Sequence, residues 1–210
     1  MLIRRDVSSL VIDTLGDQAS EKNIVVACFY FDFAARKEHS PTATLGALLR
    51  QVVNGLAEIP EEVVEAYNRH KRVAGGRGPQ LSEILEMLQT ASTSRRIFIC
   101  VDALDECAVE HQQVVLESLQ EISKKSPGTR LFLTARSHFR NGIRVLLAGT
   151  ATFMDIKPNR RDIITYILAK LEDDTNKDAM NTSLKADILT KIPPSVSGMY
   201  VGAKTPENSP

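Results

Sequence analysis

The sequence lacks tryptophan, has few aromatic residues of any kind and carries no net charge. Phe, Tyr and Trp make up 5% of the 210 residues, so an aromatic platform for stacking bases or sugars is not favoured. The 26 basic residues balance the 26 acidic ones, which removes the bulk attraction that drives proteins onto nucleic acid. With 43% hydrophobic and 25% charged residues, the composition is that of an ordinary globular protein.

Cysteine and long apolar runs are also scarce. Cys28, Cys100 and Cys107 follow no zinc or disulfide spacing, and we interpret Cys28 and Cys100 as small hydrophobic residues. No window approaches the roughly 18 apolar residues that a membrane span needs. The first 15 residues lack the apolar core of a signal peptide. We therefore expect a cytoplasmic protein with no membrane partner and no nucleic-acid partner.

The hydrophobic pattern predicts buried strands that alternate with helices. Apolar runs rich in β-branched and aromatic residues predict strands at 24–33, 96–104 and 130–135, with a weaker fourth at 152–156. Apolar residues three and four positions apart predict helices at 1–15 (closed by Gly16), 41–56, 60–72, 81–88, 109–125, 160–171 and 184–192. This alternation predicts an α/β fold with a mostly parallel sheet flanked by helices.

We expect three regions along the chain. Residues 1–157 contain the predicted strands and form the core. Residues 158–199 form a helical extension, and residues 200–210, which show no periodicity, form a disordered tail.

An acidic cluster follows the second predicted strand. The apolar run delivers Asp102, and Asp105 and Glu106 come three and four residues later. A carboxylate at the end of a buried strand is costly unless it binds a cation or accepts hydrogen bonds. Magnesium carried by a nucleotide is a common solution in strand–helix folds. Alternatively, Asp105 or Glu106 merely favours the start of the next helix.

A polar group and a cation follow the third predicted strand. Thr134 and Arg136 belong to the T-A-R sequence at its end, beside the acidic cluster if the two strands are neighbours. There they could reach a γ-phosphate. Alternatively, Arg136 forms a structural ion pair with Asp102 or Asp105.

These motifs, in this order, resemble a known family. F-Y-F-D-F, then L-L-R-Q-V, I-F-I-C-V-D-A-L-D-E-C and T-R-L-F-L-T-A-R are similar to the fungal NACHT-type P-loop NTPases of the STAND class, with the nephrocystin 3-like N-terminal domain. The resemblance implies that Asp102 is the Walker B magnesium ligand. It also implies that Asp105 and Glu106 activate water, that Arg136 is a sensor of the γ-phosphate, and that magnesium and ATP are the cofactors.

One part of the family pattern is missing from the sequence. The 210 residues contain no G-x-x-x-x-G-K-[ST], the loop that cradles phosphate and supplies a phosphate-binding lysine. We therefore interpret the chain as a partial P-loop NTPase fold that lacks the first central strand and the phosphate loop. The absent strand would lie beside the strand at 130–135, so its loss leaves an unpaired edge unless another strand fills the gap.

Two main functions follow from these observations. The first is a fragment of a NACHT/STAND signalling NTPase domain, from a family implicated in signal transduction and heterokaryon incompatibility. It would bind or hydrolyse little ATP on its own, so whether it is an enzyme stays open. The second is a non-catalytic module that associates with full-length family members through the exposed sheet edge. A magnesium-dependent phosphatase using Asp102 and Asp105 ranks last, because its motif requires the spacing D-x-D.

Overall fold

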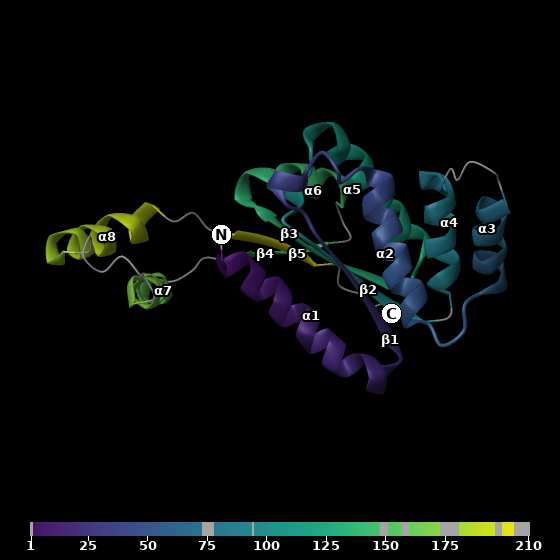
Figure 1. Ribbon diagram of the computed structural model, residues 1–210, viewed down its shortest axis with the longest axis horizontal. Coiled ribbons are helices and arrows are strands. Elements are labelled where there is room, and N and C mark those ends of the chain that lie inside the picture. Colours follow the sequence, from purple (N-terminus) through teal and green to yellow (C-terminus); the bar gives the residue numbers. More distant parts are fainter. Residues whose placement is uncertain are drawn as a thin grey trace. The chain divides into compact units, whose positions relative to one another are not determined.

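A computed structural model describes residues 2–72, 78–93, 95–147, 151–156, 160–172, 181–195 and 199–203. The chain divides into two compact units, one made of Met1–Met154 and Tyr200–Pro210, the other of Asp155–Met199. The first unit holds the parallel strands and most of the helices (Figure 1). The second holds α7 (Arg160–Glu172) and α8 (Thr182–Ser195), which pack against each other. No helix among the described residues has both the length and the hydropathy of a membrane span.

The first unit is an α/β structure built on parallel strands. The sheet order is β1-β2-β3-β5-β4, and β1 to β3 pair in parallel. The strands are β1 (Ile24–Tyr30), β2 (Arg96–Asp102), β3 (Thr129–Arg136), β4 (Thr152–Ile156) and β5 (Met199–Ala203). This confirms the predicted fold class, which is consistent with a partial nucleotide-binding-like fold.

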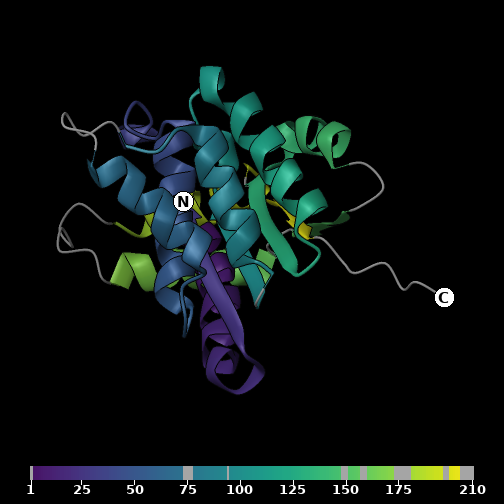
Figure 2. The same cartoon turned by 90° about the vertical axis from the view of Figure 1, so that its right-hand side faces the viewer.

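Helices cover both faces of this sheet. In Figure 1, α1 (Leu2–Lys22) lies on one face, and α2 (Pro41–Gly55), α4 (Leu81–Ala91) and α5 (Val109–Lys125) lie on the other. The remaining helices of this unit are α3 (Glu61–Arg72) and the short α6 (Arg140–Leu146), and Figure 2 shows the layers from the side. The side chains buried between α2, α4 and α5 and the strands include Leu45, Leu48, Ile84, Ile97, Ile99, Leu119 and Leu133.

The first helix and first strand differ from the prediction. The helix does not stop at Gly16 but continues to Lys22, because a glycine in open space can be tolerated inside a helix. It ends at Asn23, whose φ of 53° is the left-handed conformation that commonly terminates helices. Strand β1 ends at Tyr30 and not at residue 33, since Asp32 caps a 3₁₀ turn at Phe33–Ala35 by accepting from the Ala34 N–H at 2.9 Å.

Two further elements were missed. The pattern gave no sign of α6, and residues 200–203 were assigned to a disordered tail. The structure places residues 199–203 in β5, between β3 and β4, and residues 204–210 lie outside the described part of the chain. The edge of β3 that we expected to be unpaired is thus occupied by a strand from far along the sequence.

Candidate functional site: the carboxyl ends of β2 and β3

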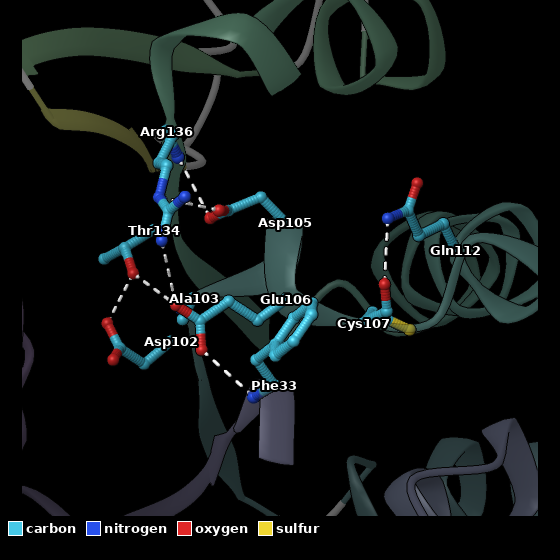
Figure 3. Close-up of polar contacts among 9 residues, drawn as sticks. All are labelled: Phe33, Asp102, Ala103, Asp105, Glu106, Cys107, Gln112, Thr134 and Arg136. Atoms are coloured by element: carbon cyan, nitrogen blue, oxygen red, sulfur yellow. Dashed lines mark hydrogen bonds and ion pairs between the residues drawn. The ribbon is translucent and has the colours of Figure 1, made fainter. Parts of the chain in front are cut away.

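The predicted site residues converge where β2 and β3 end. The two strands run in parallel with Val101 opposite Leu133, so the residues that follow each strand emerge at the same edge of the sheet. Asp102 closes β2, Asp105 and Glu106 lie in the turn after it, and Thr134 and Arg136 lie at the end of β3 (Figure 3). The structure therefore brings together the four predicted site residues. Asp102 contacts Thr134, and Asp105 and Glu106 both contact Arg136.

Asp102 is held by neutral hydroxyl groups. Its side chain is 5% exposed, and its Oδ1 atom accepts hydrogen bonds at 2.5 Å from both Ser8 Oγ and Thr134 Oγ1. Both hydroxyl residues are 1% exposed. No residue in the described part of the chain donates to the other carboxylate oxygen, Oδ2. The charge of Asp102 is therefore oriented by two hydroxyls without being neutralised by a cation.

Thr134 also fixes the backbone after Asp102. Its Oγ1 atom accepts from the Ala103 N–H at 3.0 Å while it donates to Asp102. Ala103 has a φ of 53°, an unfavourable left-handed conformation for a residue with a Cβ atom. Strain of this kind persists only where surrounding contacts hold it, and it concentrates at functional sites. One threonine hydroxyl thus couples the carboxylate to the turn that carries Asp105 and Glu106.

The other two carboxylates share the guanidinium of Arg136. The guanidinium lies 3.3 Å from Asp105 Oδ2 (Nε) and 3.4 Å from Glu106 Oε1 (Nη2). The backbone N–H of Arg136 donates to Asp105 Oδ1 at 3.0 Å, and the Phe33 N–H donates to Glu106 Oε2 at 3.3 Å. The Asp105 and Glu106 side chains are 2% and 9% exposed, whereas that of Arg136 is 53% exposed. Arg136 here serves in an ion pair with Asp105, one of the alternatives left open by the sequence.

The oxygen atoms fit magnesium only when other ligands come with it. In the described ranges, no group of three or more His, Cys, Asp or Glu residues could enclose a metal ion. Magnesium, however, is commonly bound by one or two carboxylates together with waters and substrate phosphates. Asp102, whose Oδ2 atom has no donor among the described residues, fits that second arrangement.

The neighbouring cysteine is not set up as a nucleophile. Burial, together with the smaller effect of the Glu110 charge, raises the pKa of the Cys107 thiol to about 11. The reactive thiolate is scarce at neutral pH when the pKa is this high. Cys107 contributes its backbone carbonyl instead, which accepts from Gln112 Nε2 at 2.9 Å (Figure 3).

Fold and site together define a class: an α/β protein with an acidic strand end at the carboxyl edge of a parallel sheet. The family model described as nephrocystin 3, N-terminal, matches residues 7–136, which is more than half of the chain. The chain therefore belongs to this family, and the match supports a NACHT-like domain. No curated protein and no solved structure matches the chain.

Sequence reasoning missed two partners at this site. Ser8 lies 94 residues from Asp102 and sits on α1, where a serine at an apolar position of the helix was the only available signal. The contact from the Phe33 N–H to Glu106 depends on where β1 ends, which the apolar run overestimated by three residues.

Proposed function

We propose that the carboxyl ends of β2 and β3 form the magnesium-binding side of a nucleotide-dependent switch. Asp102 would hold the ion through Oδ2, while Ser8 and Thr134 keep the carboxylate oriented. The observation that carries this proposal is that the buried carboxylate of Asp102 is held by two hydroxyl groups and has no basic partner among the described residues. In line with the resemblance, the switch would belong to the signalling NTPases of fungi, including those of heterokaryon incompatibility.

The roles of the other residues follow from their charges. Glu106, or Asp105, would orient a water molecule for attack on a phosphate. To do so, the carboxylate must exchange its contact with Arg136 for the water. Once this contact is broken, the guanidinium of Arg136 would be available to stabilise the negative charge that develops on the phosphate during attack.

We further propose that the chain alone binds and hydrolyses ATP weakly or not at all. The 210 residues contain no phosphate loop, so backbone N–H groups arranged for phosphate and the phosphate-binding lysine are missing. A bound nucleotide supplies phosphate oxygens to the metal, and this chain supplies one carboxylate. An affinity of about 1 mM or weaker, roughly 4 kcal/mol, is what such a partial site would give.

The experiment uses manganese with ATP as a paramagnetic substitute for the magnesium nucleotide. In NMR spectra, the amide signals of Ala103 and Thr134 should broaden with millimolar Mn²⁺–ATP. Asp102→Asn should remove the broadening, and Asp13→Asn on α1 serves as the matched control. Broadening that is absent, or that survives in Asp102→Asn, contradicts the metal-binding role. Robust ATP hydrolysis that is sensitive to Glu106→Gln would overturn the proposed inactivity.

The second candidate function is a non-catalytic module that associates with full-length family members. The edge of β3 that was expected to serve this association is occupied by β5, a late segment of the chain that lies between β3 and β4. A strand from a partner would have to displace β5 to reach the edge of β3. Deleting residues 199–210 should therefore strengthen binding to a purified full-length family member, relative to deleting residues 204–210. Equal binding by the two deletions at micromolar concentration would count against this function.

A further inference from the structure

The opposite end of the sheet is formed by strand β1. Strand β1 is the terminal strand of the sheet, and β2 is its one partner among the described strands. The Phe31 N–H, directly after β1, donates to the Asp102 carbonyl, so the backbone of Phe31 faces β2. Because successive residues of a strand direct their backbone groups to opposite sides, the backbone groups of Ile24, Val26, Cys28 and Tyr30 face outward. This is the row that another strand would bind.

A glutamine side chain occupies the middle of that row. Gln51 of α2 accepts from the Cys28 N–H at 3.0 Å through Oε1 and donates to the Cys28 carbonyl at 2.8 Å through Nε2. A second donation from Nε2 reaches the Ala47 carbonyl at 3.2 Å, one helical turn earlier. Both N–H groups of the amide are therefore used, and its carbonyl is too. The side-chain amide makes the same pair of hydrogen bonds with Cys28 that a neighbouring strand would make.

The helix is brought close enough for this contact by a glycine. A Cβ atom at Gly55 would lie 2.7 Å from Val25 Cγ1, closer than real side chains approach one another. Gly55 is four residues after Gln51, so both lie on the face of α2 that meets β1. The close approach at Gly55 is consistent with the reach of the Gln51 amide.

We propose that Gln51 is an edge guard that prevents β1 from pairing with β1 of a second copy of this chain. The strand Ile24–Tyr30 contains no charged residue and no proline, the two features that usually protect an exposed edge. An antiparallel pair of identical strands about a two-fold axis is self-complementary, so the second copy is the partner that this edge fits. The guard acts by removing the central donor and acceptor of the row from such pairing.

The first test compares Gln51→Met with the wild-type protein. Methionine has nearly the same length but cannot bond to the Cys28 backbone. In sedimentation velocity between 1 and 100 µM, Gln51→Met should shift toward a dimer with rising concentration, at concentrations where the wild type does not shift. Gln113→Met, at an exposed position of α5, is the matched control and should behave as the wild type does. An unshifted Gln51→Met protein that keeps its circular dichroism overturns the proposal.

A second variant separates edge pairing from aggregation of a damaged fold. Val26→Pro removes an outward N–H group, and proline is tolerated on edge strands. Combined with Gln51→Met, it should reverse the association. Association that persists in the double variant comes from another surface and overturns the proposal.

Hydrogen exchange on dilute protein tests the contact itself. The Cys28 amide should exchange at least tenfold faster in Gln51→Met than in the wild type, whereas the Phe31 amide, which bonds to β2, should be unchanged. Equal acceleration of both amides, or of neither, contradicts the guard.

Discussion

The two acidic groups at the carboxyl edge of the sheet are held in different ways. Asp102 is held by the hydroxyls of Ser8 and Thr134, whereas Asp105 and Glu106 are held by the guanidinium of Arg136. Hydroxyls orient a carboxylate but leave its charge in place, and a guanidinium neutralises it. Among the described residues, Asp102 is thus a carboxylate without a basic partner, whereas Asp105 and Glu106 share one guanidinium.

The largest effect is expected from removing the hydroxyl that orients Asp102. Thr134→Val would leave the buried Ala103 N–H without its partner, and Asp102 Oδ1 would keep only the hydrogen bond from Ser8. Each unsatisfied buried group costs about 1–3 kcal/mol, so we expect a loss of about 3 kcal/mol in the free energy of unfolding. Urea unfolding measures it. Thr134→Ser, which keeps the hydroxyl, should lose less than half as much, and equal losses would show that packing, not hydrogen bonding, is at work.

The second largest effect is expected from removing the guanidinium of Arg136, which pairs with Asp105 and Glu106. Arg136→Gln should cost about 1 kcal/mol, because half of the guanidinium is exposed and solvent screens the attraction. The loss should shrink as salt is raised to 1 M. Lys125→Gln is the control: that lysine pairs with Glu121 at 2.7 Å on the exposed face of α5, lowering the pKa of Glu121, and its removal should cost less. If salt does not change the loss of unfolding free energy in Arg136→Gln, packing of the aliphatic part of the arginine side chain is responsible.

A smaller change is expected at Asp102 itself. Asp102→Asn keeps an oxygen acceptor for Ser8 and Thr134 and removes a charge that no described cation neutralises. The free energy of unfolding should therefore change by no more than about 1 kcal/mol, in either direction. A loss of 3 kcal/mol in urea unfolding would mean that the charge is compensated after all, and the comparison between the two acidic groups would fail.

The smallest effect is expected from relieving the backbone strain at Ala103, which lies between Asp102 and the Asp105–Glu106 pair. Ala103→Gly should raise the free energy of unfolding by about 0.5 kcal/mol, since relief of the left-handed conformation exceeds the entropy cost of glycine. In a double-mutant cycle with Thr134→Val, the two changes should not be additive, because the threonine holds that turn. Additive effects would show that strain and hydrogen bond are independent.

Sequence patterns predicted most of the sheet and the gathering of the acidic residues. Apolar runs located β1 to β4, and parallel pairing then required Asp102 and Arg136 to emerge at one edge. What escaped prediction depends on contacts between distant residues. Gln51 and β5 have no local signal, and Ser8 has only its apolar position on a helix. A serine, a glutamine or a five-residue segment acquires its role only from the strand it meets. The chemical roles of the four site residues stay predictions.

The placement of β5 has a consequence for the order in which the protein is made. Roughly 60 residues separate the end of β3 from the start of β5, and synthesis proceeds at about 5–20 residues per second. For about 3 to 12 s on the ribosome, β3 exists without the strand that will lie beside it. Non-local pairing of this kind is also slow to form. The nascent chain thus passes through an interval in which chaperones, or strands of other chains, meet an edge that the finished molecule covers.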